Sequence, residues 1–498
     1  MRSKIISCAS CLVIGRWSLI VVLLLALLGC RRATPTSESV LPTQVQSPLL
    51  PTVIPTPTPE LQPMIVTLEL WLPEELDPYS DKLGADVLAQ QLDDFSEAYP
   101  DVQVEVIVKK AHGRGGLLDF MRTAQDAAPS IMPDLVVLDA AELEDAAGLG
   151  LIQPLDPLLS SADVAERFPF ATELGTVGEQ TMGFVIGADV QHLAYRPALL
   201  DSPPVSWTQF VSPSVSFLFP AGGRDRQVND ATLIQYLAAG GRLSDEEGNP
   251  SLDEDVMVSV LGFYSDCVSA ATASPIMPTA MLIISPTISP VISPTTSLTA
   301  SLTISPATAL TVPLTVSPTI ILPTVSMTIS PTVILGIRDA DQAWEQFKNG
   351  EGDIAVVPAG RYWLETDGSV APAPIPTHDG RPFSISRREW AIAMVAGDPA
   401  RQALAMLLFN WLISPDHNGQ WTRAAGYLPG TRSALRLWDV SNADRAMLRD
   451  VLDAAVPAPR SEVMQVVGPV MQDALQAVLQ GWDTPEEAAA SAVKDLGQ

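Results

Sequence analysis

The chain has 498 residues, and its 57 acidic against 29 basic side chains give a formal net charge of −28. This length is enough for two or three domains, each with a buried core. A chain this acidic repels phosphate backbones and anionic lipid surfaces, so the composition excludes nucleic acid as an expected partner.

The first thirty residues have the pattern of an export signal. The basic residues Arg2 and Lys4 precede an apolar run over residues 18–28, and Cys30 follows closely. This order resembles a bacterial lipoprotein signal, in which residues 1–29 are removed as a signal peptide and Cys30 is acylated. An uncleaved membrane anchor is the alternative, although the run is shorter than the roughly 20 residues of a typical span. Either interpretation places the remainder outside the cytoplasm, held to the cell membrane.

A Pro/Thr-rich stretch follows the signal. Residues 30–63 contain mainly Pro, Thr and Ser with scattered Val and Leu, and they show no periodic apolar face. As an extended polyproline II chain they would reach about 100 Å. We therefore predict a tether between the membrane and the folded domain.

An α/β pattern begins after the tether. Apolar residues alternate over 66–70, recur at helical spacing over 87–99 up to Pro100, and alternate again over 102–108. Residues 135–138 form a continuous apolar run, which is typical of a buried strand. Strands that alternate with helices in this way predict a mainly parallel sheet covered on both faces.

A second low-complexity tract covers residues 272–335. It contains repeated Ile-Ser-Pro-Thr words, and no charged residue occurs between Asp266 and Arg338. Frequent prolines remove backbone donors and disfavour both helices and central strands. We predict a disordered or glycosylated insertion, with a short Ser/Thr-rich β-stalk as the alternative.

The last third of the chain is predicted to be mostly helical. Asp398-Pro399 is a helix cap followed by a proline at the first helical position, and an amphipathic apolar pattern runs over residues 404–412. Thr484 begins a capping box that opens the last helix.

Five short segments are informative through their order and spacing along the chain, because no single one of them is diagnostic. They are 66–71 with 93–102, 133–139 with 148–156, 193–197 with 204–207, 344–363, and 403–429. Together they resemble the extracellular solute-binding proteins, family 1, of ABC transporters, whose best-known members bind maltose and other sugars. The chain departs from the family pattern at Arg196-Pro197, where Asn-Lys is usual, and in having the insertion.

The resemblance implies an α/β fold of the periplasmic-binding-protein type II class, with two α/β lobes, a hinge and an interlobe cleft. The expected lobe I comprises residues 64–188 with 391–428, and the expected lobe II comprises 189–390 with 429–498, including the insertion. The expected crossings between the lobes lie near 187–191, 386–391 and 428–432. Ligand capture would involve closure of the hinge.

Sugar recognition requires aromatic faces together with hydrogen-bonding side chains. Ligands of open α/β sheets bind at the carboxyl ends of strands, which selects Trp71 after the first predicted strand and Asp139 after the strand at 135–138. Core packing is the alternative for Trp71, and helix capping is the alternative for Asp139.

Four more candidate ligand-binding residues come from the resemblance. Tyr195 and Trp363 match segments that line the cleft in relatives, Trp390 falls at a predicted crossing, and Tyr427 lies where the hinge wall is expected. Packing in the core is the alternative for the two Trp residues and for Tyr195. Structural support is the alternative for Tyr427.

The sequence shows no constellation typical of an enzyme. Its four histidines are scattered without metal-ligand spacing, and neither a nucleophile elbow nor a phosphate-binding loop occurs. Cys267, the only cysteine beyond residue 30, lies in an apolar helical pattern that favours packing. The acidic clusters lack the spacing of a calcium loop. We therefore expect no catalytic residue, no metal site and no cofactor.

These patterns together predict the extracellular substrate-binding component of an ABC import system. It would act as a monomer that captures a small polar solute, most simply a mono- or oligosaccharide, and delivers it to the permease subunits. Two alternatives remain open at the level of sequence. One is a surface-anchored polysaccharide hydrolase using Glu365 or Asp379, and the other is an adhesive surface protein whose Pro/Thr tracts are the functional part.

Overall fold

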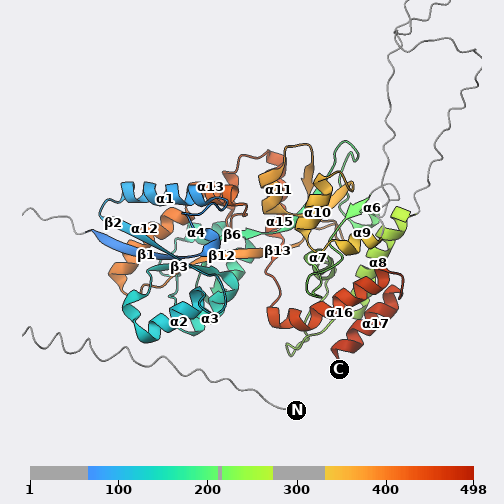
Figure 1. The fold of residues 1–498 in the computed structure, drawn as a ribbon, viewed down its shortest axis with the longest axis horizontal. Coiled ribbons are helices and arrows are strands. Elements are labelled where there is room, and N and C mark those ends of the chain that lie inside the picture. The colour runs from blue at the N-terminus through green and yellow to red at the C-terminus, as the bar shows by residue number, and fades with distance from the viewer. Residues whose placement is uncertain (1–64, 211–215, 273–330, 498) are drawn as a thin grey trace, which may run out of the picture. The chain divides into compact units, whose positions relative to one another are not determined.

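The computed structural model describes residues 65–210, 216–272 and 331–497. The predicted signal peptide, Cys30, the tether and residues 273–330 of the insertion lie outside these ranges. The described part forms a mixed α/β fold with two main sheets (Figure 1). Among its helices, none is both long and apolar enough to cross a membrane.

The larger sheet has five strands in the order β2-β1-β3-β12-β6. Their bounds are Val66–Pro73 for β1, Val102–Lys109 for β2, Leu135–Asp139 for β3, Phe184–Asp189 for β6 and Arg387–Met394 for β12. β1 runs parallel to β2 and β3, whereas β12 runs antiparallel to β3 and β6. The prediction of a mainly parallel sheet is therefore confirmed, with β12 as an antiparallel strand within it.

Alternation along the strands of this sheet divides its side chains between two layers of helices. Leu68 and Leu70 of β1 pack with α1 (Ala85–Ala98) and α12 (Pro399–Ile413) on one face. Val136 and Leu138 of β3 pack with α2 (Leu117–Ala127) and α3 (Leu143–Gly148) on the other face. Because successive strand residues point to opposite faces, a short apolar strand supplies both cores at once.

The second sheet has the strand order β10-β7-β9-β8. Its strands are β7 (Gln191–Tyr195), β8 (Phe217–Leu218), β9 (Ile354–Pro358) and β10 (Ala371–Ala373). Helices α7 (Asp230–Ala238), α8 (Glu254–Thr272), α10 (Ala340–Lys348), α11 (Ala359–Glu365), α16 (Ser461–Leu479) and α17 (Pro485–Leu496) accompany it (Figure 1). The remaining helices are α4 (Ser161–Glu166), α5 (Pro169–Leu174), α6 (Trp207–Phe210), α9 (Pro331–Gly336), α13 (Pro415–Ala425), α14 (Arg432–Arg436) and α15 (Asn442–Asp453). Two small two-stranded sheets complete the fold: β4 (Thr176–Val177) pairs with β5 (Gln180–Thr181), and β11 (Ser384–Ile385) pairs with β13 (Ala455–Val456).

The chain passes from one main sheet to the other at Asp189. β6 ends at this residue, and β7 begins two positions later. The buried Asp189 carboxylate accepts hydrogen bonds from the backbone N–H groups of Val190 (2.9 Å) and Gly360 (2.8 Å) through Oδ1. Its Oδ2 lies 3.6 Å from the guanidinium of Arg388 on β12. One buried carboxylate thus joins both main sheets and the helix α11.

The C-terminal end of the insertion differs from the sequence prediction. Pro331 opens the helix α9, although the proline content of residues 272–335 was expected to exclude helices. The physical reason is that proline is well tolerated at the first position of a helix, where its missing N–H has no intrahelical partner. Ile334 and Ile337 are buried, so this helix is attached to the core.

The predicted helix starts in the last third of the chain are confirmed. The Asp398 side chain accepts hydrogen bonds from the backbone N–H groups of Ala400 and Arg401 at the start of α12. Thr484 and Glu487 cap α17 reciprocally, with both hydrogen bonds of the capping box present. These caps satisfy backbone donors that would otherwise lack partners.

The burial of Asp189 predicts a pH-dependent stability. Burial raises the pKa of this carboxyl from 3.8 to about 6, against the opposing effects of Arg388 and of the two N–H donors. A raised folded-state pKa means that the stabilisation is complete below about pH 4 and is lost as the pH rises through 6. Relative to Asp189→Asn, the wild-type free energy of unfolding should therefore fall by about 2.4 kcal/mol between pH 4 and pH 7.

Urea denaturation of both proteins at several pH values measures this difference directly. Groups that titrate identically in the two proteins cancel in the subtraction, which leaves the contribution of Asp189. A difference that is constant with pH, or that grows in favour of the wild type as the pH rises, would contradict this assignment.

The insertion is predicted to be dispensable for folding. Helices α8 and α9, which flank residues 273–330, both pack against α16. Replacing residues 273–330 with a Gly/Ser linker of about ten residues should leave unfolding cooperative and stabilise the fold by roughly 1.5 kcal/mol, because a shorter loop costs less closure entropy. Thermal unfolding of the two proteins checks this expectation. A large drop in the midpoint would show that the segment contributes to the core.

Candidate functional site

A set of polar and aromatic side chains gathers at one edge of the larger sheet. β3 ends at Asp139, and the chain reaches His112 three residues after the end of β2. Because β12 is antiparallel to β3, its first half lies at this same edge, and Trp390 pairs directly with Asp139. The carboxyl ends of parallel strands are where open α/β sheets bind their ligands.

His112 lies between two carboxylates at this edge. Its Nδ1 is 3.1 Å from Glu142 Oε1, and its Nε2 is 3.5 Å from Asp139 Oδ2. The imidazole ring stacks over Trp390, with centroids 6.4 Å apart and planes inclined by 13°. Burial raises the pKa of the Glu142 carboxyl, while the hydrogen bond with His112 opposes that effect. The His112 side chain itself is 52% exposed and thus accessible from solvent.

Two aromatic residues underlie this polar layer. The indole Nε1 of Trp390 donates a hydrogen bond of 3.0 Å to the hydroxyl of Tyr427. Tyr427 stacks against Trp421 at 5.6 Å on one side, and the guanidinium of Arg388 lies 4.5 Å from its ring centroid. Trp390 and Tyr427 are each only 5% exposed. In this conformation the solvent-facing groups are therefore His112 and Arg388, with the aromatic rings beneath them.

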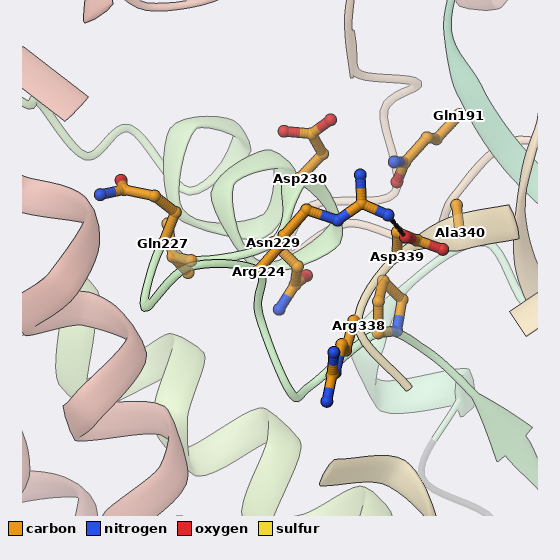
Figure 2. A pocket seen from close by; sticks show the side chains of 10 residues that line it. Gln191, Arg224, Gln227, Asn229, Asp230, Arg338, Asp339 and Ala340 are labelled. Atoms are coloured by element: carbon orange, nitrogen blue, oxygen red, sulfur yellow. Dashed lines mark hydrogen bonds and ion pairs between the residues drawn. The ribbon is translucent and has the colours of Figure 1, made fainter. Parts of the chain in front are cut away.

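A pocket of about 170 Å³ lies next to the second sheet (Figure 2). Gln191 at the start of β7 lines it together with Pro220, Arg224 and residues 227–230 and 338–340. Arg224 forms an ion pair with Asp339 across the pocket, as Figure 2 shows. The Gln191 side-chain oxygen is buried and has no hydrogen-bond partner among the described residues, so it offers an acceptor to a bound hydroxyl or amine.

Arg387 connects the pocket to the edge of the larger sheet. Its guanidinium binds Asp230 in the pocket wall through Nη2–Oδ1 (2.6 Å) and Nε–Oδ2 (3.1 Å). Trp390 follows three residues later on the same strand, whose pairing with β6 is irregular between these two residues. The strand β12 therefore contributes to the pocket wall through the Arg387–Asp230 pair and to the cluster around His112 through Trp390.

The pocket loop carries backbone strain. Asp225 and Arg226 both have left-handed backbone conformations, with φ of 53° and 62°, and Arg388 on β12 has φ of 55°. Such conformations cost energy in residues other than glycine, and they concentrate at functional sites. Asp225 and Arg226 are the two central residues of a tight turn, because Arg224 and Gln227 pair as an antiparallel bridge, and such a turn requires left-handed φ values at both positions.

The structure brings three of the six sequence-predicted site residues together. Asp139 and Trp390 contact His112, and Tyr427 joins them through its hydrogen bond with Trp390. Asp139 also accepts a hydrogen bond from the N–H of Ala141, so it serves as the helix cap considered from the sequence.

The other three predicted residues lie elsewhere. Trp71 is inside β1, which continues to Pro73, and the side chain is 1% exposed in the core against Phe120, so the prediction that it follows the strand is wrong. Trp363 is buried in α11 beside His192. Tyr195 ends β7 four residues beyond Gln191, which places it about 13 Å along the strand from the pocket.

Sequence reasoning overlooked His112 and Arg388. His112 follows the strand at 102–109, and the rule that selects Asp139 at the carboxyl end of a strand applies equally to that strand. Arg388 carries no sequence signal of this kind, because its position depends on the antiparallel insertion of β12.

The cluster is not arranged as a metal site. Within the described ranges, no group of three or more His, Cys, Asp or Glu side chains is placed to hold a metal ion. Its chemistry is that of hydrogen bonding, stacking and charge, which suits the recognition of a polar solute.

The chain matches no family model and no curated relative. Solved structures nevertheless share its fold. A solute-binding protein of extracellular family 1 from Alicyclobacillus acidocaldarius aligns with a TM-score of 0.60 at 15% identity, over 87% of this chain and 98% of that chain.

Two further solved structures share the fold of this chain. The cyclic α-maltosyl-1,6-maltose binding protein from Arthrobacter globiformis aligns with a TM-score of 0.57 at 14% identity, over 86% of this chain and 98% of that chain. Maltose-bound MalE3 from T. maritima aligns with a TM-score of 0.54 at 20% identity, over 87% and 99%. The resemblance seen in the sequence is therefore confirmed at the level of the fold, and the chain has the type II periplasmic-binding-protein fold found in the sugar-binding proteins of extracellular solute-binding family 1.

Proposed function

We propose that this protein is the extracellular substrate-binding component of an ABC import system, and that it binds a sugar without transforming it. The observation that carries the proposal is the meeting of Asp139, His112 and Trp390 at the carboxyl edge of the larger sheet. The fold is that of proteins whose descriptions name maltose and related saccharides.

The chemistry of the two walls suits a sugar. A saccharide presents hydroxyl groups around its rim and apolar C–H groups on its faces. Asp139 and Glu142 are acceptors for hydroxyl groups, Arg388 is a donor, and the exposed His112 ring, supported from below by Trp390, supplies a flat surface. Of the six residues selected from the sequence, we retain Asp139, Trp390 and Tyr427 in the proposed site.

We propose that ligand capture involves closure of two lobes built around the two main sheets. The passage from β6 to β7 at Asp189 supports the boundary at 188/189, and we keep the boundary at 428/429. The strand β12 pairs with β3 and β6 along its whole length, so we move the boundary expected at 390/391 to the start of this strand at Arg387. In such an arrangement the ligand lies between the His112 cluster and the Gln191 pocket. Hinge bending about a few residues is sufficient for closure.

The proposal includes attachment to the cell membrane. The sequence around Cys30 supports lipidation, and the Pro/Thr-rich segment at 30–63 supports a tether long enough for the binding protein to reach its permease. Both segments lie outside the described residues. We propose that the protein acts as a monomer, requires no cofactor and transfers its ligand to the permease subunits.

A hydrolase is the less favoured alternative. Hydrogen bonds from Lys348, Arg361 and Trp344 outweigh the effect of burial and hold the pKa of Glu365 at about 2, whereas a general acid needs a raised pKa. The backbone N–H of Arg381 lowers the pKa of Asp379, which is also exposed. Neither carboxyl group has the environment of a proton donor at neutral pH.

A ligand screen tests the proposal. In a thermal-shift panel of neutral mono- and oligosaccharides that includes maltose, at least one sugar should raise the unfolding midpoint. A sugar at 100 times its dissociation constant stabilises the folded chain by about 2.7 kcal/mol. Chromatography of the bound sugar after incubation distinguishes a receptor from a hydrolase, because a receptor releases no shorter products. No stabilisation by any sugar would count against the assignment.

Site variants then locate the binding surface. His112→Ala removes a stacking and hydrogen-bonding group, so the affinity for the sugar found in the screen should fall about ten-fold, equivalent to about 1.4 kcal/mol. The control Tyr195→Phe, on the distant end of β7, should bind as the wild type does. Calorimetric titration measures both variants. If the two weaken binding equally, the site lies elsewhere.

A further inference from the structure

A cavity lined by four arginines lies between α14 and α15, apart from the proposed sugar site. Its volume is about 250 Å³. Arg432 and Arg436 are four residues apart on α14, and Arg445 and Arg449 are four residues apart on α15. That spacing places each pair on one face of its helix, and both faces line the same cavity.

The charge of this cavity is opposite to that of the protein. Every charged residue in its lining is an arginine, and no Asp or Glu lines it. The whole chain has only 29 basic residues and a net charge of −28. The amino-terminal end of the 12-residue helix α15 also opens here, since Asn442 is both its first residue and part of the lining. Its helix dipole adds further positive potential.

Carboxylates at the rim compensate three of the four arginines. Arg432 pairs with Asp453 and also donates to the carbonyl of Arg167 (2.6 Å). Arg436 contacts Glu166 at 3.0 Å.

Arg449 pairs only with its exposed neighbour Asp450 at 2.7 Å. Exposed pairs of this kind contribute little binding energy and exchange readily with a stronger anionic partner.

Arg445 has no carboxylate partner among the described residues. It donates to the side chain of Asn442 (2.9 Å) and to the carbonyls of Trp438 (2.8 Å) and Val440 (3.1 Å). Its Nε is buried and makes no hydrogen bond within the described part of the chain. Because all three acceptors are neutral, the positive charge of this guanidinium is not compensated by a carboxylate, and an anion in the cavity would compensate it.

We propose that this cavity binds a phosphate group. A single carboxylate needs one arginine, whereas a phosphate has several acceptor oxygens and a charge near −2, which matches several guanidinium forks. The site does not depend on the sugar cleft, and its occupancy is a separate property of the protein. The phosphate is either a free anion or part of a lipid headgroup.

Inorganic phosphate is the first probe. It is titrated into the full-length protein at about 0.15 M ionic strength, where the screening length of about 8 Å limits repulsion by the distant acidic residues. Calorimetry and ³¹P line broadening should show saturable binding to the wild type. Arg449→Ala should weaken it at least ten-fold, and this variant should fold because Arg449 is half exposed and contacts only Asp450.

The control is Arg122→Ala, which removes the same charge from an exposed ion pair with Asp119 on α2, outside both proposed sites. It should bind phosphate as the wild type does. Arg445→Gln provides a second test of the cavity, with its folding checked by circular dichroism. Equal losses in Arg449→Ala and Arg122→Ala would overturn the proposal, because general electrostatics would then explain the binding.

A second probe distinguishes the two sources of phosphate. Vesicles of phosphatidylglycerol in phosphatidylcholine are compared by sedimentation with vesicles of phosphatidylcholine alone. Binding of inorganic phosphate without vesicle binding supports a free anion. Vesicle binding that requires Arg449 and the anionic lipid supports a headgroup. If neither probe binds, or if binding is unchanged in both cavity variants, the proposal is wrong.

Discussion

The register of β12 against its neighbours is the constraint on which the candidate site depends. Cα pairing of Trp390 with Asp139 brings a strand from late in the chain to the carboxyl edge of the first three strands. The same strand places Arg387 against Asp230 of the second sheet. A shift of β12 by one residue would turn Trp390 to the opposite face and separate it from His112 and Tyr427.

The buried carboxylate of Asp189 complements this arrangement. It lies where the chain leaves the larger sheet and holds the first turn of α11 through the N–H of Gly360. An added Cβ at Gly360 would lie 2.0 Å from the carbonyl oxygen of Gly426, so only glycine permits this approach of α11 to the end of α13. Backbone contacts as close as this restrict the paths along which the two sheets can move relative to each other.

Local charge in this protein differs from the average charge. The sequence is strongly acidic, yet one arginine pairs with Asp189, another pairs with Asp230, and four line the cavity between α14 and α15. Net charge describes long-range repulsion, which salt screens beyond about 8 Å, whereas a binding site responds to the groups that line it. An acidic protein can therefore contain sites for anionic or polar ligands.

The sequence by itself determined the order of strands and helices up to β3, the caps of α12 and α17, and Asp139 as a residue at a strand end. These features are local, because they depend on periodicity and on neighbours in the chain. Only the tertiary structure decided that Trp71 faces the core, that Pro331 opens a helix, and that His112, Trp390 and Tyr427 share one surface. Those outcomes depend on which strands become neighbours, and pairing between residues hundreds of positions apart leaves no mark on the local pattern of either strand.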